Sequence, residues 1–256
     1  MKTNFKNAIV RKPAKSMVDG ITESQLGKPD YEKALQQHSD YVKALEYCGL
    51  QVKVLESDDR FPDSCFVEDV SVCTSKFAVV TNPGAESRNG EIVAMKDVLP
   101  EYFEQIKNIE FPGTLDGGDI MMVEDHFYIG LSDRTNKLGA AQLIKHLSEY
   151  GFTGSIVTLN EMLHLKTGIN YIGDSNFLVT GEFINHPAFK DLNKHIVPED
   201  EAYAANSLWV NGTIIVPSGF PKTQKMIEDL GYKTILVDTS EFRKLDGGLS
   251  CLSLRF

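Results

Sequence analysis

Hydrophobic positions along this chain follow two different spacings, which together predict a mixed α/β protein. Apolar residues at helical spacing predict three helices, over residues 30–48, 135–150 and 221–230. Shorter apolar runs on both sides of a turn predict hairpins over residues 121–130 and 207–216. The second hairpin contains Asn211-Gly212, the dipeptide that most favours a tight turn between two strands.

The strands recur along the chain, each time behind a polar loop. Five such units begin near residues 61, 114, 164, 203 and 245, roughly 40 to 53 residues apart. A period of this size is typical of arrays and propellers. The tetrad Leu-Asp-Gly-Gly occurs at residues 115 and 245, which favours duplication. We therefore expect one domain over residues 1–256, an α/β ring of pseudo-fivefold symmetry that brings its five polar loops to a common axis.

Length and charge narrow the class of protein. The chain has 256 residues, of which 42% are hydrophobic, enough for an ample core. Its net charge of −10 repels nucleic acids and anionic membranes, so we expect neither as a partner. Residues 1–18 lack a signal-peptide core, and no apolar stretch approaches a membrane span. We expect a cytoplasmic protein with reduced thiols that acts on a small molecule, and we leave a homodimer open.

The first candidate for chemistry is a cysteine close to the last residue of the sequence. Cys251 follows Gly247 and Gly248, in a segment that alternates apolar and polar residues like a strand. Because a thiolate forms far more easily near neutral pH than an alkoxide, Cys251 is a better nucleophile candidate than its neighbour Ser250. The alternative is a structural cysteine, since unpaired cysteines are often buried.

A histidine and a carboxylate could complete a site for thiol catalysis. His164 follows an apolar pair and precedes Thr167-Gly168, at an expected strand-to-loop junction, although a core histidine bonded to the backbone is an alternative there. Asp116 lies in a glycine-rich loop and could orient a histidine or hold a cation, although aspartates also favour turns. The chain lacks a His-Glu-x-x-His motif and a His/Cys cluster, so we expect neither a metal nor another cofactor.

Acids and aromatic residues alternate within one short segment. Asp63, Phe66, Glu68 and Asp69 lie within seven residues of sequence. Carboxylates this close to apolar side chains are costly to desolvate unless a cation or hydrogen-bond donors meet them, which favours a pocket over a solvated turn.

Two arginines in polar loops could bind an anion. Arg88 and Arg134 would together grip a carboxylate through their forked donors, although surface charge is the ordinary role of such residues.

Taken together, these motifs resemble the bacterial type of dimethylarginine dimethylaminohydrolase, a family of the guanidine-modifying (amidinotransferase) superfamily. The resemblance spans nearly the whole chain. It rests on the following segments: Asp19-Gly20, Leu26-Gly-Lys-Pro-Asp30, Arg60-Phe-Pro-Asp-Ser64, Phe66-Val-Glu-Asp69, Pro83-Gly-Ala-Glu-Ser-Arg88, Asp119-Ile-Met-Met122, Arg134-Thr-Asn136, His164-Leu-Lys-Thr-Gly168, Tyr203-Ala-Ala-Asn206, Asp246-Gly-Gly and Cys251-Leu-Ser-Leu-Arg-Phe256. It implies a five-module α/β propeller that hydrolyses N-omega-methylated arginines to citrulline and a methylamine.

The resemblance also implies a role for each candidate residue. Cys251 would be the nucleophile that forms a covalent thiouronium, His164 the acid and base, and Asp116 the acidic partner. The substrate would be bound by the remaining candidates: Asp69 and nearby Glu68 at the guanidinium, Arg88 and Arg134 at the carboxylate, Asp63 at the amino group, a lid around Ile21, and Phe66 and Ser250 in the pocket wall.

One position bears on the choice between relatives. Arginine deiminases and amidinotransferases have an aspartate two residues after the histidine, where it can bind an unsubstituted guanidinium nitrogen. This chain has Lys166 there. A carboxylate facing N-methyl groups would lack a donor, so Lys166 favours a methylated substrate. A deiminase-like or other guanidine-modifying enzyme and a non-catalytic propeller stay open as alternatives, the latter disfavoured by the presence of all four of Cys251, His164, Asp116 and Asp69.

Overall fold

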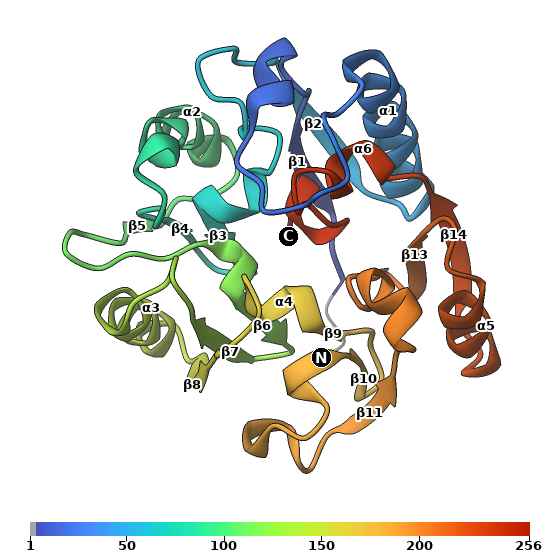
Figure 1. Cartoon of the computed structure of the whole chain (residues 1–256). Helices are drawn as coiled ribbons and strands as arrows, with labels where there is room; N and C mark the ends of the chain where they lie inside the picture. The colour runs from blue at the N-terminus through green and yellow to red at the C-terminus, as the bar shows by residue number, and fades with distance from the viewer. Residues whose placement is uncertain (1–3) are drawn as a thin grey trace.

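The computed structural model describes residues 4–256 and consists of five three-stranded sheets around a central axis (Figure 1). Residues 1–3 lie outside the described residues. They are the first residues of the segment 1–18, in which we expected no signal peptide. The strands are β1 (Asn7–Arg11), β2 (Gln51–Leu55), β3 (Ser71–Cys73), β4 (Ala78–Val80), β5 (Ile106–Asn108), β6 (Ile120–Val123), β7 (His126–Leu131), β8 (Thr153–Thr158), β9 (Ile169–Tyr171), β10 (Asn176–Val179), β11 (Asn193–Ile196), β12 (Leu208–Val210), β13 (Thr213–Pro217), β14 (Lys233–Val237) and β15 (Leu254–Arg255). The predicted five-module α/β propeller is confirmed.

Every sheet has the same internal order. Its first strand pairs antiparallel with the middle strand, and the middle strand pairs parallel with the third. Because a parallel pair needs a crossover, a helical segment joins the middle strand to the third strand of each module. The remaining sheet joins both ends of the chain, since β15 pairs with β1 and β1 with β2. This pairing closes the ring.

The helices are mostly outside the sheets, with α4 and α6 nearer the axis (Figure 1). The α-helices are α1 (Tyr31–Tyr47), α2 (Ile92–Val98), α3 (Lys137–Glu149), α4 (Leu165–Gly168), α5 (Pro221–Asp229) and α6 (Ser240–Arg243). The 3-10 helices are η1 (Lys15–Asp19), η2 (Val67–Val70), η3 (Glu86–Glu91), η4 (Leu99–Glu101), η5 (Gly117–Asp119), η6 (Gly181–Phe183), η7 (Pro187–Phe189), η8 (Glu199–Ala205) and η9 (Ser250–Leu252). Among residues 4–256, no helix has both the length and the apolar character needed to cross a membrane.

Local chemistry explains the elements that the sequence predicted. Helix α1 begins after Asp30, whose side chain accepts a hydrogen bond from the backbone of Lys33, and α3 begins after Asn136, which caps in the same way. Asn211 and Gly212 both have positive φ, as a tight hairpin turn requires. The three predicted helices and both predicted hairpins are therefore confirmed.

The residues near the nucleophile candidate differ from the expected strand. Cys251 lies in the 3-10 helix η9, and the strand β15 begins only at Leu254. The tight turn before it is at Asp246, which has a positive φ of 57°. Gly247 allows close contact with the Phe66 ring, and a Cβ on Gly248 would lie 2.6 Å from the side-chain amide of Asn206. These glycines therefore permit close packing against protein side chains.

Candidate active site

The five polar loops meet at one end of the axis. In each module a short helical turn comes immediately before the first strand of the sheet. These turns are η2, η5, α4, η8 and η9, and they contact one another across the module boundaries. The repeating topology therefore brings together residues that lie far apart in sequence, such as Glu68 and Ser250, which are hydrogen-bonded across 182 positions.

Cys251 borders a hollow at this end of the axis. Its Sγ accepts a hydrogen bond from the backbone N–H of Gly248 at 3.4 Å. Burial, together with the charges of Glu68 and Asp69, raises the pKa of the Cys251 thiol to about 12. Without a bound cation this cysteine is a neutral thiol at neutral pH.

His164 lines the same hollow as Cys251. It precedes helix α4, and its Nδ1 forms an ion pair with Oδ2 of Asp119 at 3.3 Å. Burial alone would lower the pKa of His164, but the charge of Asp119, helped by Asp69 and Asp116, raises it to about 9. The imidazole is therefore a cation at neutral pH and has a proton to give.

Asp119 is fixed by three donors from other segments. Its Oδ2 accepts hydrogen bonds from the hydroxyls of Ser132 and Thr135 at 2.6 and 2.7 Å, and its Oδ1 accepts from the backbone of Leu165 at 3.0 Å. Because Leu165 follows His164 directly, Asp119 holds both the ring and the backbone of the histidine segment. The sequence analysis did not single out this residue.

Two further carboxylates surround His164. Asp69, Asp116 and His164 present polar atoms that all lie within 4.8 Å of one another. Gly84 donates its backbone N–H to Oδ1 of Asp116 at 2.8 Å, whereas Oδ2 of Asp116 has no partner among residues 4–256. Burial and the charge of Asp69 raise the pKa of Asp116 to about 7. The trio therefore places two carboxylates and an imidazole around one point of the hollow, where they could face a cation.

Arg88 lines the same hollow as Arg134, but its guanidinium is held by acids of the protein. It is buried, and its guanidinium forms ion pairs with Asp69 at 2.6 Å and Glu91 at 2.8 Å. It also donates to the carbonyl oxygens of Asp63 and Phe66. Burial would raise the pKa of Asp69, but Arg88 and His164 hold it below its ordinary value. Arg88 thus lines the hollow, and each of its three guanidinium nitrogens donates to an acceptor in the protein.

Arg134, Asp63 and Ile21 border the outer part of the hollow. Arg134 is partly exposed, and its side chain makes no hydrogen bond or ion pair with any residue of the range 4–256. The backbone N–H of Ile21 donates to both oxygens of Asp63, at 3.0 and 3.3 Å. The loop after Ile21 is attached to Asp246, which accepts hydrogen bonds from the side chain of Thr22 and the backbone of Glu23. The structure therefore brings the expected lid, amino-group ligand and carboxylate ligand together.

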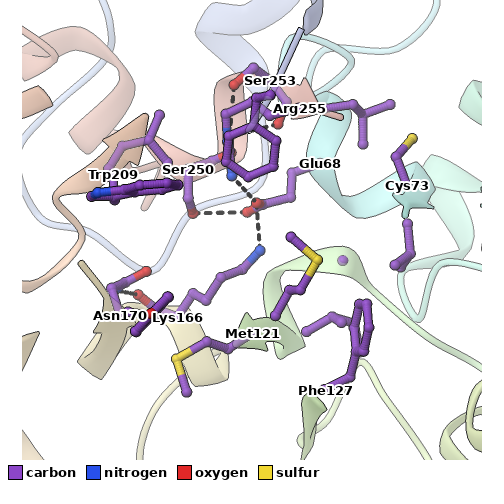
Figure 2. A pocket seen from close by; sticks show the side chains of 18 of the residues that line it. Glu68, Cys73, Met121, Phe127, Lys166, Asn170, Trp209, Ser250, Ser253 and Arg255 are labelled. Carbon is purple, nitrogen blue, oxygen red and sulfur yellow. Dashed lines mark hydrogen bonds and ion pairs between the residues drawn. The ribbon is translucent and has the colours of Figure 1, made fainter. Parts of the chain in front are cut away.

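Glu68 and Ser250 do not line this hollow but a second cavity, beside the first strands of the sheets. Ser250 also lines a further hollow that His164 and Cys251 border. Figure 2 shows the carboxylate of Glu68 between Lys166, Ser250 and Arg255. Lys166 forms an ion pair with Glu68 at 2.5 Å, and Ser250 donates to Glu68 at 2.8 Å. Arg255 lies 3.4 Å from Glu68. This network occupies the ammonium group of Lys166.

Comparison with known proteins identifies the family. The family model described as "N,N dimethylarginine dimethylhydrolase, eukaryotic" matches residues 18–216. A dimethylarginine dimethylaminohydrolase of Pseudomonas aeruginosa is 53% identical, over 98% of this chain and 100% of the relative. One of Streptomyces coelicolor is 34% identical, over 98% and 96%. This chain belongs to the dimethylarginine dimethylaminohydrolase family.

Solved structures agree with this assignment to the dimethylarginine dimethylaminohydrolase family. A Pseudomonas aeruginosa member, a cysteine-to-serine variant in complex with citrulline, has a TM-score of 0.98 and 52% identity over 99% of this chain and 100% of its own. A histidine-to-glycine variant of a family member, present as its adduct with S-methyl-L-thiocitrulline, has a TM-score of 0.97 and 52% identity over 98% and 100%. The chain is an enzyme of this hydrolase family.

Two residues of this family member escaped the sequence analysis although their segments were quoted. Asp119 begins the quoted segment Asp119-Ile-Met-Met122 but was given no role, and Asn206 ends the Tyr203-Ala-Ala-Asn206 segment. A weak signal was available for both, since Asp119 lies one position before β6 and Asn206 two positions before β12, each the first strand of a module. Their partners lie in other modules, which a single sequence does not reveal.

Proposed function

We propose that this chain hydrolyses N-omega-methylated L-arginines to L-citrulline and a methylamine, through a covalent thiouronium on Cys251. The observation that carries the proposal is that Cys251, His164, Asp69 and Asp116 line one hollow although they come from four modules. A thiol, a protonated imidazole and two carboxylates are the groups needed to attack a guanidinium carbon and release an amine.

Substrate binding uses the charge of the hollow. Asp69 and Asp116 hold the guanidinium flat, with its carbon facing the sulfur. The unpartnered Oδ2 of Asp116 supplies an acceptor for one of its N–H groups. Arg134 binds the α-carboxylate, and Asp63 with the backbone of Ile21 binds the amino group. Arg88 keeps Asp69 ionised and in place.

The bound cation activates the thiol. A unit charge at ~4 Å and an effective dielectric of ~20 contributes ~4 kcal/mol. This corresponds to a fall of about 3 units in the thiol pKa, part of which the carboxylates cancel. The thiol proton leaves to solvent, since His164 is already protonated. The thiolate then attacks the guanidinium carbon, and the C–S bond forms.

His164 acts twice in the proposed reaction. Its imidazolium gives its proton to the methylated nitrogen, the C–N bond breaks, and neutral methylamine departs. The neutral imidazole then takes a proton from water, and the resulting hydroxide adds to the thiouronium carbon. The C–S bond breaks, the sulfur leaves as thiolate, and the hydroxyl proton is lost to give citrulline.

Lys166 supports a methylated substrate over plain arginine. Its ammonium group is paired with Glu68. No carboxylate therefore lies at this position to accept hydrogen bonds from an unsubstituted terminal nitrogen. Deiminase activity on plain arginine is the alternative.

A citrulline assay with dimethylarginine, monomethylarginine and arginine tests the proposal. We expect turnover of both methylated substrates, little with arginine, and none in Cys251→Ser. Faster release of citrulline from arginine would favour the deiminase alternative. We further propose that the reaction takes place in the cytoplasm, in keeping with four unpaired cysteines.

A further inference from the structure

Four of the five modules place a chemically active side chain beside the turn that precedes their first strand. Asp69 precedes β3, Asp116 precedes β6, His164 precedes β9 and Cys251 precedes β15. The corresponding residue of the remaining module is Asn206, two positions before β12. It is neither an acid, a base nor a nucleophile, so its contribution must come from its hydrogen bonds.

The side-chain amide of Asn206 joins the turns of two other modules. Its Nδ2 donates to the carbonyl oxygen of Lys166 at 2.9 Å and to Oγ of Ser250 at 3.1 Å. Its Oδ1 accepts from the backbone N–H of Ser250 at 2.9 Å. Both donors and the acceptor of the amide are thus engaged, and the side chain is buried.

These contacts adjoin the reacting groups. Lys166 is two residues after His164, and Ser250 is the neighbour of Cys251. Ser250 in turn donates from Oγ to Glu68, the neighbour of Asp69. A single amide therefore ties the backbone of the acid–base segment to the backbone of the nucleophile segment, and through Ser250 reaches the segment that holds the guanidinium.

Gly248 leaves space for the side-chain amide of Asn206. A Cβ on Gly248 would lie 2.6 Å from both Cγ and Oδ1 of Asn206. Only glycine leaves room for the amide at this point of the segment.

We infer that Asn206 is a positioning residue that sets the distance between the sulfur of Cys251 and the imidazole of His164. The inference rests on the roles proposed for those two residues. A displacement of about 1 Å at a reacting centre can cost on the order of 100-fold in rate. The groups proposed to bind the substrate are Asp63, Asp69, Asp116 and Arg134, and Asn206 makes no hydrogen bond to any of them. The consequence of losing the amide is therefore a lower kcat with a nearly unchanged KM.

Asn170 provides a matched control. Its Nδ2 also donates to the carbonyl oxygen of Lys166, at 2.7 Å, and its second bond goes to the carbonyl oxygen of Ala205 at 2.9 Å. It is buried like Asn206 but has no hydrogen bond to the nucleophile segment. Replacing it removes a buried amide and a bond to Lys166 while keeping the bridge to Ser250.

The experiment measures kcat, KM and melting temperature for Asn206→Ala, Asn170→Ala and Cys251→Ser with dimethylarginine. We expect kcat to fall about 10- to 100-fold in Asn206→Ala. We expect KM to stay within about 3-fold of wild type and Asn170→Ala to keep most of its kcat. A kcat within about 2-fold of wild type in a folded Asn206→Ala, or equal losses in both alanine variants, would overturn the inference.

Asn206→Asp is a second variant that tests the inference if the alanine variant fails to fold. It preserves the shape and the acceptor for Ser250 but removes the donors to Lys166 and to the Ser250 hydroxyl, so we again expect a kcat loss at similar KM. Failure of both variants to fold would overturn the inference, because the amide would then hold the fold instead of the site. Turnover by Cys251→Ser would contradict the proposed function itself, whereas an inactive Cys251→Ser beside a fully active Asn206→Ala would contradict this inference alone.

Discussion

His164 and Asp119 form an ion pair in which Nδ1 lies 3.3 Å from Oδ2. Asp119 is fully buried and fixed by Ser132 and Thr135, so its negative charge cannot move away from the ring. This charge is the main reason why His164 titrates at about 9 despite its burial. The ion pair with Asp119 therefore keeps His164, the proposed acid, protonated at neutral pH.

Replacing Asp119 with asparagine should therefore lower the pKa of His164. The imidazolium would lose its nearest stabilising charge, so the pKa of the ring should fall by at least about one unit. The measurement is an NMR titration of the His164 ring in the free enzyme. Asp125→Asn, an exposed change of the same charge in the β6–β7 turn, serves as the control and should leave the pKa of His164 in place. An unchanged pKa of His164 in Asp119→Asn would contradict this role.

The raised pKa of Cys251 predicts how the thiol reacts with modifying reagents. Because the free thiol titrates near 12, its alkylation by neutral iodoacetamide should be slow at pH 7 and should rise with pH. A haloacetamidine, which carries a guanidinium-like charge, should react at least ~10-fold faster than the matched haloacetamide, since a bound cation favours the thiolate. Equal rates with the two reagents would mean that the hollow does not use the cation to activate sulfur.

Arg134 should determine affinity for the amino-acid end of the substrate. We expect Arg134→Ala to raise KM for dimethylarginine at least about 10-fold, because a charged hydrogen bond to the carboxylate is lost. An alkylguanidine without a carboxylate should lose much less. Comparable increases in KM for the two substrates would mean that Arg134 does not bind the substrate carboxylate.

Arg88, by contrast, should act mainly on stability. Its removal would leave the buried carboxylates of Asp69 and Glu91 unpaired, which typically costs about 3–5 kcal/mol. Denaturant unfolding of Arg88→Met should therefore show a large loss in the free energy of unfolding, with Arg134→Met as the matched control. A stable Arg88→Met that merely lost affinity for the carboxylate would instead support the role first expected for this arginine.

The sequence was sufficient for the architecture because its signals are local and repeated. Asp30 and the apolar face of the helix predicted both ends of α1 to within one residue. Asn211 and Gly212 predicted a hairpin because both residues readily adopt the positive φ that the turn requires. The recurring loop-and-strand units correctly indicated five modules. The two Leu-Asp-Gly-Gly tetrads, however, do not occupy equivalent places. The first ends two residues before β6 and the second six residues before β15.

What the sequence could not supply is the pairing between modules. Asp119 contacts the His164 segment across 46 positions of sequence, and Asn206 reaches Ser250 across 44. Which carboxylate faces the imidazole depends on how neighbouring modules pack, and Asp116 and Asp119 are both reasonable from sequence. Arg88 shows the same limit, since its burial against Asp69 depends on a contact between separate loops.

The central claim is that the sulfur of Cys251 attacks the guanidinium carbon while His164 completes the hydrolysis. The most direct measurement is peptide mass spectrometry of His164→Gly after incubation with S-methyl-L-thiocitrulline, a substrate analogue with a good leaving group. We predict an accumulating adduct on the peptide that contains Cys251 and none in the double variant with Cys251→Ser. An adduct on another residue, or free turnover without any adduct, would contradict the account.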